Sequence, residues 1–226
     1  MAFAVQERPL GVVESVPKTG YTMFKEHATS QIAAYILHLM GGEMAADSLM
    51  LTIYLADKEH YRTNWYPITG DDVVSTGSGP ELKNTSDIMH GIRPSEPWQR
   101  FISPVHQGMV TLIADVGPMV IYTFRYPGED EKVINLGPDN LGKLMGSERN
   151  AADRAVAKRG NKNAWNFTDI LDEFPEMQEV MPGDRIPIPV ILRSMGYDAD
   201  KIEAILEELE EREELDAIDA WMGARL

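Results

Sequence analysis

Apolar residues recur at helical spacing in the first third of the chain. Thr29 or Ser30 can cap a helix, and Gly41-Gly42 can end it. The apolar positions between them follow one helical face: Ile32, Tyr35, Ile36, Leu39 and Met40. A second helix is predicted over 44–62, and its middle, 49–56, is apolar on nearly every side. Such a segment is typical of a helix buried at the centre of a domain.

Strand patterns occupy the middle of the chain. Residues 109–113 and 119–124 are rich in β-branched and aromatic side chains, and residues 115–118 between them contain Gly-Pro. This pattern predicts an antiparallel hairpin near 109–124. A short strand is predicted near 73–76. With helices on both sides, the fold class is α+β, predominantly helical, with a small antiparallel β-sheet.

Three regions follow from these patterns. Residues 1–27 carry proline and glycine without a sustained period and are predicted to form an irregular arm. Residues 28–196 form the domain, and residues 197–226 form an acidic C-terminal helix that Asp198 can cap. Inside the domain, further helices are predicted near 81–90, 139–158 and 189–195.

The last helix carries two apolar clusters, separated by a polar break at 212–214. The first cluster, which should dock the helix on the domain, is Ile202, Ile205, Leu206 and Leu209. The second is Leu215, Ile218, Trp221 and Met222. An exposed apolar cluster favours contact with a second protein or a sister subunit, which would make a homo-oligomer. The alternative is that the tail folds back onto the basic stretch 143–162.

Charge narrows the class of partner. The net charge is −15, which argues against nucleic-acid binding through a basic face. Residues 198–219 hold eleven acidic residues against two basic ones, whereas residues 143–162 hold six basic residues against two acidic ones. The acidic helix is either an ordinary solvated face or a surface that meets a basic partner.

The chain has no cysteine, which excludes disulfides, thiolate catalysis and cysteine-based zinc sites. Its first residues show no basic segment followed by an apolar one, so no signal peptide is predicted. No apolar run approaches the length that spans a bilayer. We therefore expect a soluble protein of the cytoplasm, without a membrane partner.

The familiar motifs of phosphate loops, zinc proteases and serine hydrolases do not occur in the sequence. One pair could carry chemistry. Asp57 and His60 lie one helical turn apart, so Asp57 could orient His60 as a general base of a hydrolase, or the two could supply part of a metal site. They could equally make a hydrogen bond or ion pair at the helix end. No catalytic residue, metal or cofactor is predicted.

Two blocks of sequence carry a family resemblance. The first contains IYLADKEH at 53–60, YPITGD at 66–71 and then Gly79-Pro80. The second contains LDEFPEM at 171–177 and RIPIP at 185–189. Together they resemble the SocA/Panacea-domain antitoxin family. The chain departs from that pattern in lacking an aromatic residue before Gly79-Pro80, and in the second block, where Asp172 and Met177 replace a usual His and Trp.

The resemblance implies an antitoxin, or an antitoxin-like adaptor, that neutralises a protein toxin by direct contact or delivers it to an ATP-dependent protease. The partner-binding surface is then predicted around the end of the second helix, where aromatic and charged side chains are dense. Its residues are Tyr54, Asp57, His60, Tyr61, Trp65, Tyr66, Asp71, Gly79 and Pro80. The alternatives are a phage host-takeover or anti-defence protein that binds a host protein, the hydrolase, and a virion component, for which the sequence has no positive sign.

Overall fold

The computed structural model describes residues 23–114, 116, 119–124, 132–138, 141–142, 144–160 and 167–223. For residues 119–124, 132–138, 167–168 and 216–223 it describes the backbone path alone. The predicted arm at 1–27 therefore lies outside the described residues except for its last five, and the first helix begins inside it. That helix, α1, spans Glu26–Leu39.

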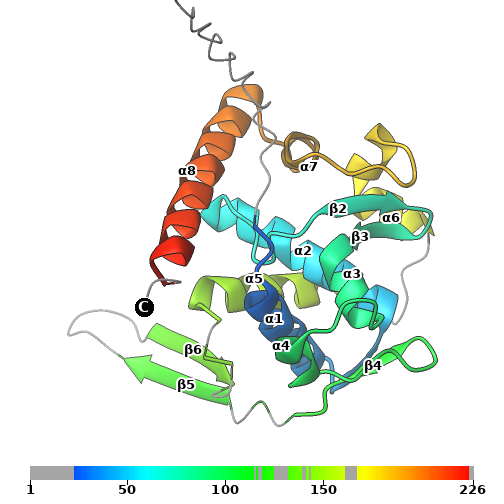
Figure 1. The fold of residues 1–226 in the computed structure, drawn as a ribbon, viewed down its shortest axis with the longest axis vertical. Helices are drawn as coiled ribbons and strands as arrows, with labels where there is room; N and C mark the ends of the chain where they lie inside the picture. Colours follow the sequence, from blue (N-terminus) through cyan, green and yellow to red (C-terminus); the bar gives the residue numbers. More distant parts are fainter. Residues whose placement is uncertain are drawn as a thin grey trace, which may run out of the picture.

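Helix α2, Ala46–Asn64, runs through the middle of the molecule (Figure 1). Every residue from Ser48 to Tyr61 is buried, as the nearly continuous apolar pattern predicts. Gly41 and Gly42, both at positive φ, end α1 and turn the chain toward α2. The prediction of a central helix over 44–62 is confirmed.

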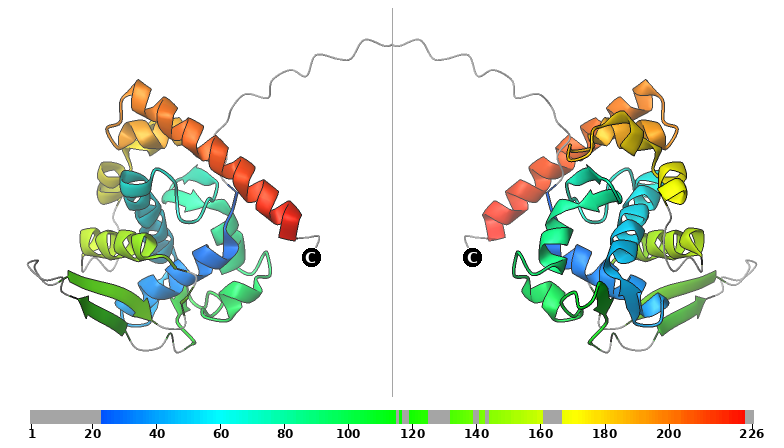
Figure 2. Two further views of the ribbon diagram at one scale, coloured as in Figure 1. Left: turned by 90° about the vertical axis from the view of Figure 1, so that its left-hand side faces the viewer. Right: turned by 90° about the vertical axis from the view of Figure 1, so that its right-hand side faces the viewer.

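Helix α5, Gly146–Arg159, packs against both α1 and α2 (Figure 2). Three alanines on its buried face, Ala151, Ala152 and Ala155, have no exposed surface, and the other buried residues are Glu148, Arg149 and Arg159. Small side chains let helix backbones approach closely. The predicted helix at 139–158 is therefore present, but it begins later than expected.

The strands pair differently from the prediction. Strand β4, Met109–Thr111, pairs antiparallel with β1, Glu43–Ala45, and not with the segment that follows it. That segment, β5 at Met119–Phe124, pairs with β6 at Lys132–Pro138. The predicted 109–124 hairpin is therefore wrong, because both of its strands find partners elsewhere.

The short strand predicted near 73–76 is confirmed as β2, Val73–Thr76. It pairs with β3, Gly79–Leu82, through the two-residue turn Gly77-Ser78. β3 leads directly into α3, Lys83–Met89. The hairpin and α3 lie on the opposite side of α2 from α5 (Figure 1).

Short helices complete the described fold: α4 (Glu96–Gln99), α6 (Phe167–Glu173), the 3₁₀ helix η1 (Pro175–Glu179) and α7 (Ile188–Ser194). The last helix, α8, spans Ala199–Gly223 and runs across the outside of the molecule (Figure 2). The side-chain oxygen of Asp198 accepts the N–H of Lys201 at 2.9 Å, which is the predicted cap.

No helix in the described part of the chain is both long and apolar enough to cross a membrane. The fold is α+β and predominantly helical.

Candidate functional site

The predicted partner surface at the end of α2 is mostly buried. His60 has no exposed surface, and Tyr54, Asp57, Tyr61 and Asp71 are buried with it. The backbone at Gly79 and Pro80 is buried as well. Of the nine predicted residues, only Trp65 is exposed, at 37%, and Tyr66 is half-buried. The expectation that this motif forms a surface is therefore wrong for seven residues, and their contacts explain why.

Asp57 ties the loop that follows α2 back onto the helix. Its Oδ1 accepts the backbone N–H groups of Ile68 and Thr69 at 2.8 and 3.0 Å, and its Oδ2 accepts the hydroxyl of Thr69. Burial raises the pKa of Asp57 to about 7, against the downward pull of these hydrogen bonds. The carboxyl is a structural acceptor with its hydrogen-bonding capacity in use.

Asp71 continues this chain of hydrogen bonds into the next helix. Its Oδ1 accepts the N–H of Asn84 at 2.9 Å, and its Oδ2 accepts the N–H and hydroxyl of Thr85, both at 2.7 Å. These N–H groups lie in the first turn of α3, where no intrahelical acceptor exists. Asp71 therefore supplies, from outside the helix, the cap that α3 lacks at its own first residue.

His60 is held inside the same framework. Its Nδ1 lies 2.8 Å from the backbone oxygen of Tyr66, and its Nε2 lies 3.3 Å from the hydroxyl of Ser147. The ring of Tyr66 packs edge-on against the imidazole at 4.7 Å. Burial lowers the pKa of His60, so the neutral ring with its proton on Nδ1 suits the carbonyl acceptor. Asp57 and His60 have separate partners and do not form the general-base pair of the hydrolase hypothesis.

The sequence interpretation missed a buried ion pair beside these residues. Nζ of Lys58 lies 2.9 and 3.0 Å from the two carboxylate oxygens of Glu176, and the hydroxyl of Tyr54 donates to the same carboxylate at 2.6 Å. Glu176 has no exposed surface. The Lys58 ammonium also lies 5.4 Å from the centre of the Phe174 ring. Burial lowers the pKa of Lys58 and raises that of Tyr54.

This cluster joins the two blocks of the family resemblance, because Tyr54 and Lys58 belong to the first block and Phe174 and Glu176 to the second. Lys58 stands among the polar residues that end α2, so its burial could not be inferred from the sequence. Nothing in the sequence identified Glu176 as its partner among the chain's many carboxylates.

Helix α8 packs over the C-terminal end of α2 and leaves part of Trp65 exposed there. Its apolar face packs into a cluster with α7 and α2: Tyr61, Ile188, Leu192, Ile202, Ile205 and Leu209. Nζ of Lys201 lies 3.2 Å from the centre of the Trp65 ring, and the guanidinium of Arg212 lies 4.2 Å from that of Tyr66. The docking role predicted for the first apolar cluster is confirmed.

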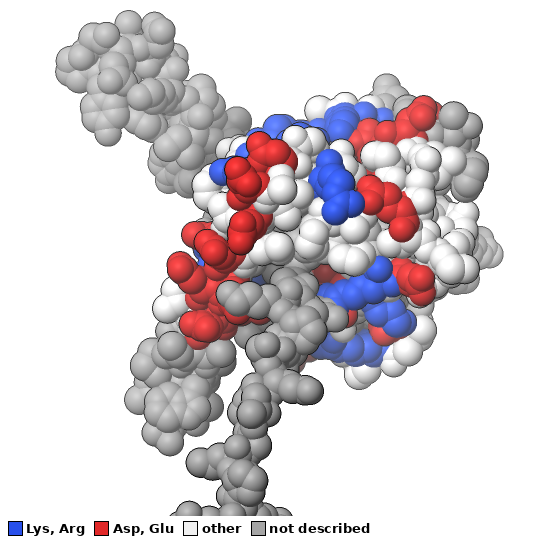
Figure 3. All heavy atoms as spheres, turned by 90° about the horizontal axis from the view of Figure 1, so that it is seen from above, with Lys and Arg blue, Asp and Glu red and all other residues white. Residues whose placement is uncertain are grey.

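The outer face of α8 carries a row of acidic side chains, which we call the acidic stripe. Its members are exposed and recur every three or four residues: Asp200, Glu203, Glu207, Glu211 and Glu214. None of them forms an ion pair with another described residue. Figure 3 shows the molecule from above, and acidic side chains form a band along one side of it. Leu215 is 61% exposed beside the stripe, whereas the side chains of Ile218, Trp221 and Met222 lie outside the described residues.

Among the described residues, the cations of α5, which lies in the basic stretch 143–162, form no ion pairs with this stripe. Arg154 pairs with Glu59 at 3.4 Å, and Lys158 pairs with Glu173 at 2.5 Å. These two cations of α5 therefore have acidic partners on α2 and α6. The side chains of the tail beyond Leu215 lie outside the described residues, so the alternative in which the tail folds back onto the basic stretch stays a prediction. Among the described residues, no three His, Cys, Asp or Glu side chains gather to hold a metal ion.

Comparison of the chain with protein-family models, curated proteins and solved structures found no match.

The environment of Asp57 predicts a pH-dependent stability. Its pKa is about 7 in the folded protein, above its ordinary value of 3.8, so the folded state binds this proton more tightly than the unfolded chain. The stabilisation from this group is therefore fully present below about pH 4 and is lost as pH rises through about 7. Urea unfolding gives the free energy of unfolding of the native protein and of Asp57→Asn. The native value minus the variant value should fall as the pH rises from 5 to 8. A difference independent of pH would contradict this assignment.

Proposed function

We propose that this chain is an antitoxin-like protein of the SocA/Panacea type, which binds a target protein directly in the cytoplasm and thereby neutralises or delivers it. Support comes from how the two resembling blocks meet. Their polar residues serve the scaffold: Asp57 and Asp71 fix the loop and α3, and Lys58 with Glu176 fixes η1 against α2. The shared pattern thus describes a framework that presents a surface.

The observation that carries the proposal is the acidic stripe. Five exposed carboxylates, which form no ion pair with any described residue, lie on a helix whose other side is anchored by apolar packing and by Lys201 and Arg212. From residue 200 to residue 214 the stripe extends about 21 Å at 1.5 Å per residue. That length is on the scale of one side of a protein–protein interface. A complementary target presents a basic surface, which the stripe would attract over a distance and then orient.

Trp65 gives this surface an aromatic edge. It ends α2 in the left-handed conformation, with φ of 66°, and its ring remains partly exposed beside Lys201. Tryptophan is enriched among the residues that contribute most to interface affinity. The proposed binding surface is therefore the acidic stripe together with Trp65 and the half-buried Tyr66, which are two of the nine residues predicted from the sequence.

Co-expression tests the function. Each protein encoded beside this chain's gene is induced alone and together with this chain, and growth is followed. The proposal predicts that one neighbour arrests growth, that this chain relieves the arrest, and that the two proteins co-purify as a stoichiometric complex. If no neighbour is toxic and chemical cross-linking in infected cells captures a host protein instead, the host-takeover alternative replaces the antitoxin. If neither experiment yields a complex, the binding function itself is wrong.

A further inference from the structure

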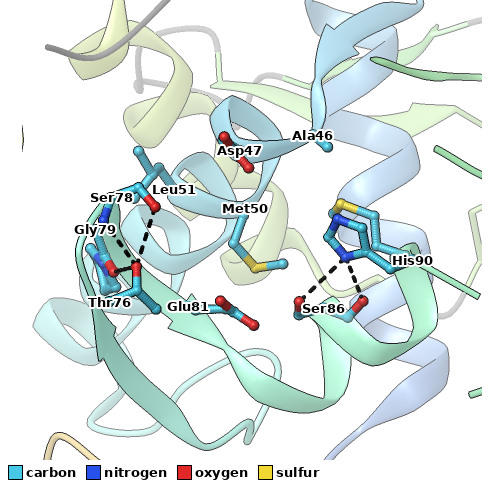
Figure 4. A pocket seen from close by; sticks show the side chains of 12 residues that line it. Ala46, Asp47, Met50, Leu51, Thr76, Ser78, Gly79, Glu81, Ser86 and His90 are labelled. Atoms are coloured by element: carbon cyan, nitrogen blue, oxygen red, sulfur yellow. Dashed lines mark hydrogen bonds between the residues drawn. The ribbon is translucent and has the colours of Figure 1, made fainter. Parts of the chain in front are cut away.

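A groove lies at the opposite end of α2 from the proposed binding surface, between the first turns of α2, the β2–β3 hairpin and α3 (Figure 4). Met50 forms its floor, and the fully buried Met89 also lines it. Asp47, Glu81 and His90 line its rim. The last α2 residue that lines the groove, Leu51, and Trp65 are separated by about 21 Å along the helix at 1.5 Å per residue. The groove is thus a second feature of the surface and not an extension of the acidic stripe.

Gly79 sets the shape of the groove. A Cβ at this position would lie 2.9 Å from Cδ2 of Leu51. The residue also has a φ of +134°, which residues other than glycine rarely adopt. The hairpin backbone therefore rests directly on α2 at this point. This close approach holds β3 and its Glu81 beside the methionine floor.

Two carboxylates flank the floor from different elements. Asp47 comes from the first turn of α2 and Glu81 from β3, and Figure 4 shows them on either side of the Met50 side chain. Neither carboxylate forms an ion pair with a described residue. The nearby cation Lys83 is paired with Asp87 at 2.7 Å. The groove therefore combines a polarisable apolar floor with a carboxylate on each side that forms no ion pair among the described residues.

We propose that this groove binds a lysine or arginine side chain of the partner protein. The aliphatic stem would lie on the thioether of Met50, which adapts to irregular shapes, with Met89 buried behind it, while the cationic head lies between Asp47 and Glu81. The inference rests on the proposed function for the class of partner, a protein with a basic surface. It adds a second, separate contact, so that one basic partner engages the scaffold at both ends of α2.

The test uses the full chain with labelled methionine methyl groups, observed by NMR and assigned through Met50→Leu and Met89→Leu. The probes are acetyl-Gly-Arg-Gly-amide and acetyl-Gly-Lys-Gly-amide. The comparison is the neutral peptide in which norleucine replaces the basic residue, acetyl-Gly-norleucine-Gly-amide. The basic peptides are expected to shift the Met50 and Met89 signals in a saturable way, and the norleucine peptide much less. Equal shifts from all three peptides, or no saturable shift, overturn the proposal.

Charge-neutral variants sharpen the result. Asp47→Asn with Glu81→Gln should weaken binding of the arginine peptide about fivefold, since each exposed pair contributes modestly. The control, Glu43→Gln with Glu96→Gln, removes the same charge from exposed positions outside the groove and should leave binding unchanged. Equal affinity in both double variants overturns the proposal. Because these titrations contain no target protein, their failure is separate from failure of the co-expression test.

Discussion

Replacing Glu176 with glutamine is expected to lower the free energy of unfolding by about 3–5 kcal/mol, the usual cost of removing one partner of a buried ion pair. Glu176 is fully buried, and its carboxylate is the acidic partner of the Lys58 ammonium. Glutamine keeps the size of the side chain and an acceptor for Tyr54 but leaves the lysine charge in the core without compensation. Urea denaturation followed by circular dichroism measures the change.

The double variant Lys58→Met with Glu176→Gln is the control for this prediction. Methionine removes the buried charge while filling similar space, so the double variant should recover a large part of the lost stability. The explanation fails if Glu176→Gln costs less than about 1 kcal/mol, or if the double variant is no more stable than the single one.

Asp57→Ala is expected to destabilise the protein by about 3 kcal/mol, because it leaves the N–H groups of Ile68 and Thr69 and the Thr69 hydroxyl without their acceptor. An interface residue would behave differently, since its removal would weaken target binding and leave the fold stable. Glu211→Ala, on the exposed stripe, is the matched control and should change stability by about 0.5 kcal/mol or less. Equal melting temperatures for the two variants would show that Asp57 does not stabilise the fold, and would contradict this structural role.

The helices could be predicted from the sequence because their information is local. The apolar run of α2 and the cap at Asp198 depend on residues within one or two turns. The strand pairing could not be predicted in this way. β1 has only three residues, too few to show a period, and its pairing with β4 is set by the turn between α1 and α2. There the N–H of Leu112 reaches the carbonyl of Gly42 at 2.8 Å.

The candidate site shows the same division between local and distant information. The sequence pointed to the end of α2, where Trp65 and Tyr66 lie against Lys201 and Arg212 of α8, and a partner surface there stays a prediction. Asp57, His60 and Asp71 were predicted to lie on the surface because aromatic and charged side chains are dense at this end of the helix. Their burial depends on partners that no spacing rule predicts, such as Ser147 for His60. The buried polar residues of the two blocks thus stabilise the scaffold, and most of the proposed recognition residues lie outside the blocks, on α8.

The affinity of the purified complex for a charge-reversed stripe tests this account most directly. The variant carries Glu203→Lys, Glu207→Lys and Glu211→Lys, and calorimetry at two salt concentrations gives Kd. The control carries Glu43→Lys, Glu96→Lys and Asp184→Lys, three exposed acidic positions outside α8. The account predicts that the stripe variant binds the target at least about tenfold more weakly, with a reduced salt dependence, and that the control binds as the native chain does. A stripe variant that binds like the native chain would contradict it.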